Sequence, residues 1–397
     1  MMIFPFSAKK ERAFIAGILV LAFILRAIAA LVIPDQSHLL SDAAAYRESA
    51  LHLLSYWQMA NSYQMPLYPL LIAVTGPGLG QLAADITLSV ISVWLVCELT
   101  RELFADQYAT IFSGLIAACY PPLVFFSVVG LSETLFITLI LVCFLSWYRA
   151  NFAVAAVAAV LAILTRPVFD IFAPALVILF ALVIHRFSFI QMLGRLAVYA
   201  AIYCVLMTPW WLSNYQAYGQ FVRLTPGGGT ALYAGNNPLN HSGGGNVGVD
   251  YDLTAFKKIA NPVERDRALR NAAVGYIADH PLRFLELTGL KFIRMWRPWP
   301  ANEGYRSLAT VVIAISSFVP VVLLAGMGVF LKRTMVRCLS PILLFALSYT
   351  AVHMILLGTI RYRLPLEPFL LILSSVSISY LVRATPSFLA RARERIT

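Results

Sequence analysis

The sequence predicts an all-α polytopic membrane protein with about ten transmembrane helices. Of its 397 residues, 60% are apolar and only 12% are charged, a composition that soluble globular domains do not have. The apolar residues also come in runs of about 20, the length that a helix needs to cross about 30 Å of hydrocarbon. We therefore expect one transmembrane domain over residues 1–397.

The expected spans follow from these runs. The first, 13–33, is too long for the core of a signal peptide, and we interpret it as a retained span. The first outer loop, 34–82, is polar at its start. Its end, 66–82, is apolar but is broken by proline and glycine, which favours a re-entrant or interfacial segment. The other spans are expected at 83–100, 108–124, 131–148, 151–165, 171–186, 195–212, 307–331, 338–357 and 365–382.

Basic residues indicate the orientation. They gather at the N-terminus, at every second boundary and at the C-terminus: Lys9, Lys10, Arg12, Arg101, Arg149, Arg186, Arg195, Lys332, Arg333, Arg337, Arg383, Arg391, Arg393 and Arg395. The positive-inside rule then puts both termini in the cytoplasm. We expect a protein of the inner (plasma) membrane whose first loop and large loop, 213–306, face the periplasm or the outside. Helical spacing over 262–296 predicts one or two helices that lie on the membrane and end at Pro281 and Pro298.

Several classes of protein are disfavoured. The net charge of +11 is not gathered in basic blocks interleaved with aromatic residues, and we expect no nucleic-acid partner. The five cysteines lie in or beside apolar runs without a CxxC, which argues against a disulfide framework and a cysteine metal site. No phosphate-binding loop or dinucleotide fingerprint occurs, and we interpret the Asp250-Tyr251-Asp252 match to a DxD motif as coincidental. We expect no cofactor and no metal.

Two acids stand out on the outer side. Asp42, Tyr46 and Ser49 share one face of a polar, helix-prone segment, 41–50, directly after the first span. Glu133 opens the span that begins at 131. The simpler interpretation of either acid is that it starts a helix, where a carboxylate suits the helix dipole. Two acids from different outer segments that meet over one cavity suit a general base and a supporting acid.

Arginines lie at the same side. Arg166 precedes Pro167, Arg361 and Arg363 flank Tyr362, and Arg26 lies inside the first span near its outer end. A guanidinium group binds phosphate through two hydrogen bonds. A single arginine there more often extends to lipid headgroups, but Arg166 together with an Arg-Tyr-Arg turn favours a dedicated phosphate site. His353, near the outer end of its span, either lines the cavity or is a packed histidine.

Outer-face chemistry without a nucleotide requires a donor that arrives activated. A lipid-linked phospho-sugar meets this requirement, since its tail stays in the bilayer and its phosphate at the interface. The sequence also resembles the GT-C glycosyltransferases of the family 39 and aminoarabinose-transferase type, which are relatives of the protein O-mannosyltransferases. The matching pieces are, in order, Arg26, Ser41-Asp42-x-x-x-Tyr46, Pro66-Leu67-Tyr68-Pro69-Leu70-Leu71, Ser132-Glu133-Thr134-Leu135, Leu164-Thr165-Arg166-Pro167, Pro209-Trp210, Ala234-Gly235-Asn236-Asn237-Pro238, Trp296-Arg297-Pro298 and Arg361-Tyr362-Arg363-Leu364-Pro365-Leu366-Glu367-Pro368.

The resemblance implies a GT-C architecture and an inverting sugar transfer from a polyprenyl- or dolichyl-phosphate monosaccharide. Asp42, rather than Asp35 or Glu48, would be the general base, and Glu133 would assist or orient. The donor phosphate would be bound by Arg166, Arg361, Tyr362, Arg363 and Arg26, and the substrate cavity would include Tyr46, Tyr68, Asn236, Asn237 and His353. The acceptor would be a glycolipid, a polysaccharide or a protein.

Two departures from the family pattern are visible. Many relatives have Asp-Glu where this chain has Asp42-Ala43, so a bound divalent metal has less support here. Many relatives also have an arginine inside a Pro-Trp-x-x-x-Asn element, and this chain has none there: the element reads Pro209-Trp210-Trp211-Leu212-Ser213-Asn214. Two alternatives remain open: a transporter or flippase of lipid-linked glycans, and a polymerase or ligase that uses a pyrophosphate-linked glycan. A flippase would favour internal repeats and charges along a path through the bilayer, whereas here the polar groups gather at one face.

Overall fold

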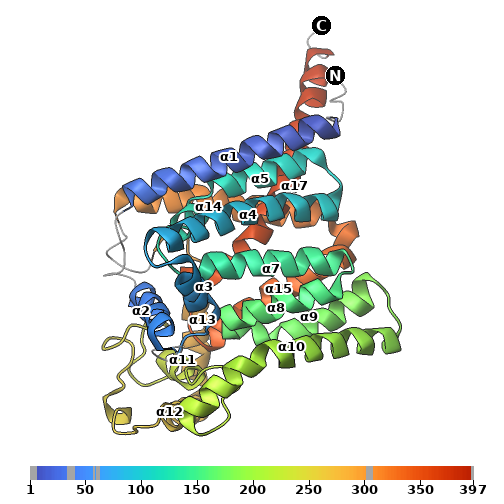
Figure 1. The fold of residues 1–397 in the computed structure, drawn as a ribbon. Helices are drawn as coiled ribbons and strands as arrows, with labels where there is room; N and C mark the ends of the chain where they lie inside the picture. Colours follow the sequence, from blue (N-terminus) through green and yellow to red (C-terminus); the bar gives the residue numbers. More distant parts are fainter. Residues whose placement is uncertain (1–6, 34–40, 57–58, 60–62, 301–306, 395–397) are drawn as a thin grey trace.

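The computed structural model describes residues 7–33, 41–56, 59, 63–300 and 307–394. These residues are mostly helical, and their only β-structure is an isolated bridge between Val247 and Tyr251. Figure 1 shows the long helices side by side, with the start of α1 and the end of α17 at one end of the molecule and α2, α3, α11 and α12 at the other. Asp35, one of the acids of the first outer loop, lies outside the described residues.

Six helices in the described part are long and apolar enough to cross a membrane. They are α1 (Ala8–Val32), α4 (Leu79–Phe104), α10 (Phe189–Tyr218), α14 (Leu308–Leu331), α15 (Val336–Ile355) and α17 (Glu367–Glu394). The other predicted spans coincide with shorter apolar helices: α5 (Gln107–Cys119), α7 (Glu133–Tyr148), α8 (Phe152–Thr165) and α9 (Ala173–Leu179), which continues as a π-helical turn (Phe180–Ile184). The chain is a multi-pass helical membrane protein, and the count of ten crossings stays a prediction.

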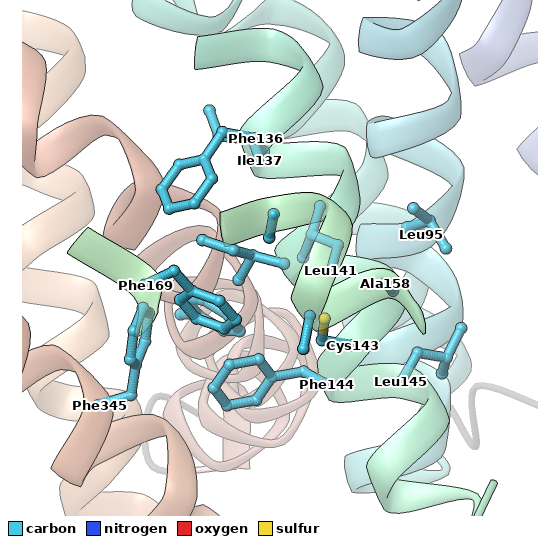
Figure 2. Close-up of a cluster of buried hydrophobic side chains, with 14 of the residues drawn as sticks. Leu95, Phe136, Ile137, Leu141, Cys143, Phe144, Leu145, Ala158, Phe169 and Phe345 are labelled. Carbon is cyan, nitrogen blue, oxygen red and sulfur yellow. The ribbon is translucent and has the colours of Figure 1, made fainter. Parts of the chain in front are cut away.

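The core is built around α7. This helix is apolar on all sides, and most of its side chains are buried. The ring centroids of Phe136 and Phe169 lie 5.9 Å apart, and those of Phe144 and Phe345 lie 5.4 Å apart. Figure 2 shows these rings in one cluster of buried apolar side chains. Because α7 is packed from every side, the acid at its first position, Glu133, is held at a fixed point.

The segment between α1 and α4 contains two helices that pack on each other. α2 (Ser41–Tyr56) buries the face that carries Ala43, Tyr46 and Ala50 against α3 (Leu67–Thr75). α3 has nine residues, which is too short to cross a bilayer, and its interfacial position stays a prediction. After the turn at 76–78, α4 begins at Leu79, four residues before the predicted start of its span.

The large loop between α10 and α14 also contains helices. α11 (Gly228–Gly235) is followed by α12 (Pro262–Asp279) and α13 (Pro281–Trp296), which are separated at Pro281. α13 exposes Leu282, Leu285 and Ile293 but buries Leu287 and Met295. An exposed apolar stripe on an amphipathic helix is typical of a helix at a membrane interface. The connection from α15 to α17 contains the four-residue α16 (Ile360–Arg363) and a short 3-10 turn, η6 (Leu364–Leu366).

Candidate active site

A cavity of about 670 Å³ lies at the end of the bundle where α2 and α11 are found. Asp42 and Tyr46 of α2 line it, together with Arg166 after α8 and Arg361 of α16. Tyr362 and His353 also line it. Thus six of the twelve predicted site residues meet at one cavity, although two of them, Asp42 and Arg361, are 319 positions apart in the sequence.

Local sequence explains where three of these segments turn. α8 ends at Thr165 because Arg166 precedes a proline and has extended backbone torsions, φ −143° and ψ 114°. α7 begins at Glu133, where a carboxylate is favoured by the dipole of the helix. α15 ends at Ile355, and the short α16 then carries Arg361 back toward the N-terminus of α7.

The charged groups of the site form one connected cluster. Arg166 Nη2 donates to Glu133 Oε1 over 2.9 Å. Arg361 donates through Nε to the same oxygen, through Nη2 to Glu133 Oε2 over 3.5 Å, and through Nη1 to Asp42 Oδ2 over 2.5 Å. The side chain of Glu133 is fully buried, whereas that of Asp42 is 51% exposed. Two guanidinium groups are therefore balanced by two carboxylates in very different surroundings.

The pKa of Asp42 reflects two opposed effects. Burial near the cluster raises the pKa, because it disfavours the charged carboxylate, but the charge of Arg361 and its hydrogen bond lower it, with a further contribution from Arg166. The net pKa lies below the ordinary value of 3.8. Asp42 is therefore ionised at neutral pH, as a proton acceptor must be.

Tyr46, which lines the cavity, is held in place by Ser132 and Tyr68. Its hydroxyl lies 3.0 Å from Ser132 Oγ, and its ring centroid is 5.0 Å from that of Tyr68. Burial raises the pKa of Tyr46, which keeps it neutral. Tyr68 does not line the cavity: its hydroxyl donates to Asp85 Oδ2 over 2.7 Å. Asp85, a buried acid that the sequence analysis did not single out, thus anchors the support of α2.

An aromatic stack borders the arginines. The ring of His353 lies 4.8 Å from that of Tyr362 and 4.4 Å from that of Tyr349. The guanidinium of Arg166 lies 5.9 Å from the centre of the Tyr362 ring and 5.8 Å from that of Phe136. Such contacts help to fix the plane of the guanidinium.

Two predicted phosphate ligands lie elsewhere. Arg363 is buried and donates to Glu367 Oε1 over 2.8 Å and to the carbonyl oxygens of Met295 and Arg297. Arg26 is also buried, and its Nε donates to Ser89 Oγ over 2.7 Å. Neither lines the cavity. The hydrogen bonds of these arginines join helices to one another, so they are structural contacts in this arrangement.

Asn236 and Asn237 likewise hold the chain rather than face the cavity. Asn236 Nδ2 donates to the Ile355 carbonyl over 2.9 Å, and Asn237 Nδ2 donates to the Asp250 carbonyl over 3.0 Å. Lys291 of α13 is fully buried beside them and donates to Asn236 Oδ1 over 2.8 Å and to the Ile355 carbonyl over 3.0 Å. These contacts fix the end of α15, from which the segment carrying Arg361 departs.

The cavity includes residues that sequence reasoning missed. Tyr63 and Gln64 follow α2, Leu357 follows α15, and Gly227 and Gly228 begin α11. The two glycines belong to the run Gly227-Gly228-Gly229, whereas the others are ordinary residues in short connections. Among the described residues, no group of three or more His, Cys, Asp or Glu is placed to hold a metal ion.

No protein-family model matches the sequence, and a comparison with curated proteins finds no match. Solved structures do resemble the chain. The oligosaccharyltransferase AglB from Archaeoglobus fulgidus, in complex with an inhibitory peptide and a dolichol-phosphate, is 13% identical with a TM-score of 0.55, over 98% of this chain and 52% of that one. The apo oligosaccharyltransferase from the same organism is 13% identical with a TM-score of 0.56, over 96% and 52%.

A third structure, ArnT from Cupriavidus metallidurans bound to undecaprenyl phosphate, is 16% identical with a TM-score of 0.47, over 94% of this chain and 60% of that one. The chain thus spans about half the length of the archaeal enzyme. The likeness to the archaeal enzyme extends over nearly all of the present chain, which confirms the predicted fold. The protein has the GT-C fold of membrane glycosyltransferases.

Proposed function

We propose that the protein transfers a sugar from a polyprenyl-phosphate monosaccharide to an acceptor hydroxyl at the outer face of the membrane, with inversion. The observation that carries this proposal is the cavity in which an ionised acid, Asp42, and two arginines, Arg166 and Arg361, meet at one end of a membrane bundle. The fold adds support, since the similar archaeal oligosaccharyltransferase was solved with a dolichol-phosphate.

The residues suit each part of such a transfer. Asp42 accepts the proton of the acceptor hydroxyl as its oxygen forms a bond to the anomeric carbon. The bond between that carbon and the phosphate oxygen breaks, and the polyprenyl phosphate leaves with the bonding electrons. Arg361 and Arg166 balance the negative charge that grows on the phosphate, an electrostatic contribution that is stronger in a site with little water. Glu133 orients both guanidinium groups.

The proposal is tested with the protein reconstituted in nanodiscs and a set of radiolabelled polyprenyl-phosphate sugars. We expect the wild type to release labelled monosaccharide to water or to an added acceptor, and Asp42→Asn to lose at least about 100-fold in rate, the usual contribution of a general base. The matched control is Glu48→Gln, which changes an exposed acid on the same helix. Normal transfer by Asp42→Asn would refute the role of Asp42.

The same material in proteoliposomes separates the transferase from the transporter. A transporter moves the labelled lipid between leaflets with its sugar attached. If the label crosses the bilayer and the glycosidic bond stays intact with every donor tested, the transferase proposal fails. Pyrophosphate-linked donors in a parallel reaction test the polymerase or ligase alternative.

A further inference from the structure

Arg361, the proposed phosphate ligand, is already paired with two carboxylates in the structure. Its Nε and Nη2 atoms face Glu133, and its Nη1 atom lies 2.5 Å from Asp42 Oδ2. Only 22% of the Arg361 side chain is exposed, so few of its N–H groups remain for a new ligand. A phosphate that binds this guanidinium through two hydrogen bonds must therefore replace one of the two carboxylates.

The surroundings decide which carboxylate leaves. Glu133 is fully buried and contacts both Arg166 and Arg361, so its removal would leave an uncompensated charge in the interior. Asp42 is 51% exposed and is held by Arg361 alone among the described hydrogen bonds. An exposed carboxylate returns to water at little cost, because surface ion pairs contribute little. Asp42 is thus the partner that a phosphate displaces.

The backbone of α2 does not have to move for this exchange. The helix is fixed by Ala43, Tyr46 and Ala50, which pack in one cluster with Tyr68 and Ile72 of α3. Asp42 lies at the start of the helix on the cavity side, where a change of side-chain rotamer is enough to separate its carboxylate from Arg361.

We infer that the ion pair between Asp42 and Arg361 is a latch that the donor phosphate opens, which frees the base only when a donor occupies the cavity. This inference rests on the proposed function and adds a mode of regulation to its site. In the empty protein the base is held against a cation, where it accepts a proton poorly. With phosphate on Arg361, the carboxylate is released toward the open part of the cavity, where the acceptor hydroxyl must arrive.

The test measures binding of undecaprenyl phosphate alone, without sugar or acceptor, to the full chain in nanodiscs. Removing the competing carboxylate should make the phosphate bind more tightly. We expect Asp42→Asn to lower the Kd by about two- to fivefold, which corresponds to the energy of an exposed ion pair. Glu48→Gln is the matched control and should leave the Kd unchanged. An unchanged or raised Kd in Asp42→Asn would overturn the latch; a raised Kd would mean that Asp42 helps to hold the phosphate.

A double-mutant cycle excludes simple repulsion between Asp42 and the phosphate. If the gain acts through Arg361, it must vanish when Asp42→Asn is added to Arg361→Ala. The same gain in both backgrounds would overturn the latch and leave only repulsion. Absence of binding in every variant would count against the proposed donor as well, whereas binding without the expected gain leaves the transferase proposal standing.

Discussion

At the scale of single residues, the site depends on how one arginine is shared by two acids. Arg361 contacts both Glu133 and Asp42, but Glu133 is fully buried and Asp42 is half exposed. The same type of ion pair should therefore have very different effects on stability in the two cases. The chain thus offers an internal comparison of a buried and an exposed carboxylate on one cation.

Glu133→Gln should destabilise the protein far more than Asp42→Asn. Loss of the buried carboxylate removes the ion-pair partner of Arg166 and leaves Arg361 with Asp42 alone, for which a loss of about 3–5 kcal/mol is expected. Loss of the exposed carboxylate should change stability by less than about 1 kcal/mol. Thermal unfolding of both variants in the same detergent provides the comparison, and equal losses would contradict the assignment of Glu133 as the central counter-ion.

The pH dependence of transfer should follow the lowered pKa of Asp42. Because the folded pKa lies below the ordinary 3.8, the base stays ionised as the pH falls toward that value, and kcat/KM should have no acid limb between about pH 5 and 7. In Arg361→Ala the lowering cause is removed while burial still raises the pKa, so the acid limb should move upward. A pH profile with the same limb in both proteins would contradict this account.

At the scale of elements, the segment between α15 and α16 is positioned by close backbone approach. A Cβ atom on Gly358 would lie 2.1 Å from the Lys291 carbonyl oxygen, and one on Gly235 would lie 1.7 Å from that of Leu356. Only glycine permits α11 and α13 to come this near to the segment that leads to Arg361. Lys291 and Asn236 then bind the last carbonyl of α15.

Gly358→Ala should push this segment away from α13. We expect a loss of about 1–3 kcal/mol in stability, together with weaker binding of undecaprenyl phosphate, because Arg361 moves with the segment. Gly289→Ala is the control, since nothing lies within 4 Å of its Cβ position in the interior of α13, and it should be neutral or slightly stabilising. Unchanged melting and binding in Gly358→Ala would show that the close approach is not required.

Lys291 should make stability depend on pH. Burial lowers its pKa from 10.5 to about 7, and the described residues around it supply an amide oxygen, a carbonyl and the Phe284 ring but no carboxylate. Above pH 7 the unfolded chain binds more protons than the folded one, so this group increases stability as the pH rises from 7 to 10.5, and its full cost is present below pH 7.

Lys291→Met keeps the volume and removes the titration. Between pH 7 and pH 9, the rise in melting temperature should be smaller for this variant than for the wild type, by several degrees. The test is a series of melting curves in one detergent at constant ionic strength. Parallel curves for the two proteins would show that the lysine does not titrate in this range.

At the scale of the whole molecule, the start of α1 and the end of α17 lie at the end opposite α2, α11 and α12 (Figure 1). Together with the basic residues near the termini, this arrangement predicts a cytoplasmic end and an outer end that carries the cavity. The positive charges of the large loop do not indicate its side of the membrane, because long loops fall outside the positive-inside rule.

The orientation is tested with single cysteines in a cysteine-free background. Ala260→Cys lies at an exposed site before α12, and Ala150→Cys lies at an exposed turn between α7 and α8. In intact cells, a membrane-impermeant maleimide should label the first and not the second, while both become labelled after permeabilisation. Labelling of position 150 alone in intact cells would reverse the topology and place the cavity in the cytoplasm.

The sequence by itself determined the class of the protein and most of its elements. Spans are local features, because a run of apolar residues long enough to cross the bilayer has few other stable environments. Charge alternation then grouped Asp42, Glu133, Arg166 and Arg361 at one face. Together with the family resemblance, these patterns led to the GT-C fold that the structural comparison confirms.

Only the tertiary structure decided which of those residues share a cavity. Arg361 and Arg363 are two positions apart, yet the first lines the cavity and the second is buried against Glu367. Arg26 turns toward Ser89, and Tyr68 supports Tyr46 from behind. The physical reason is that the direction of a side chain depends on the rotation and contacts of its helix against distant segments. Periodicity identifies a face of a helix, but packing determines what that face meets.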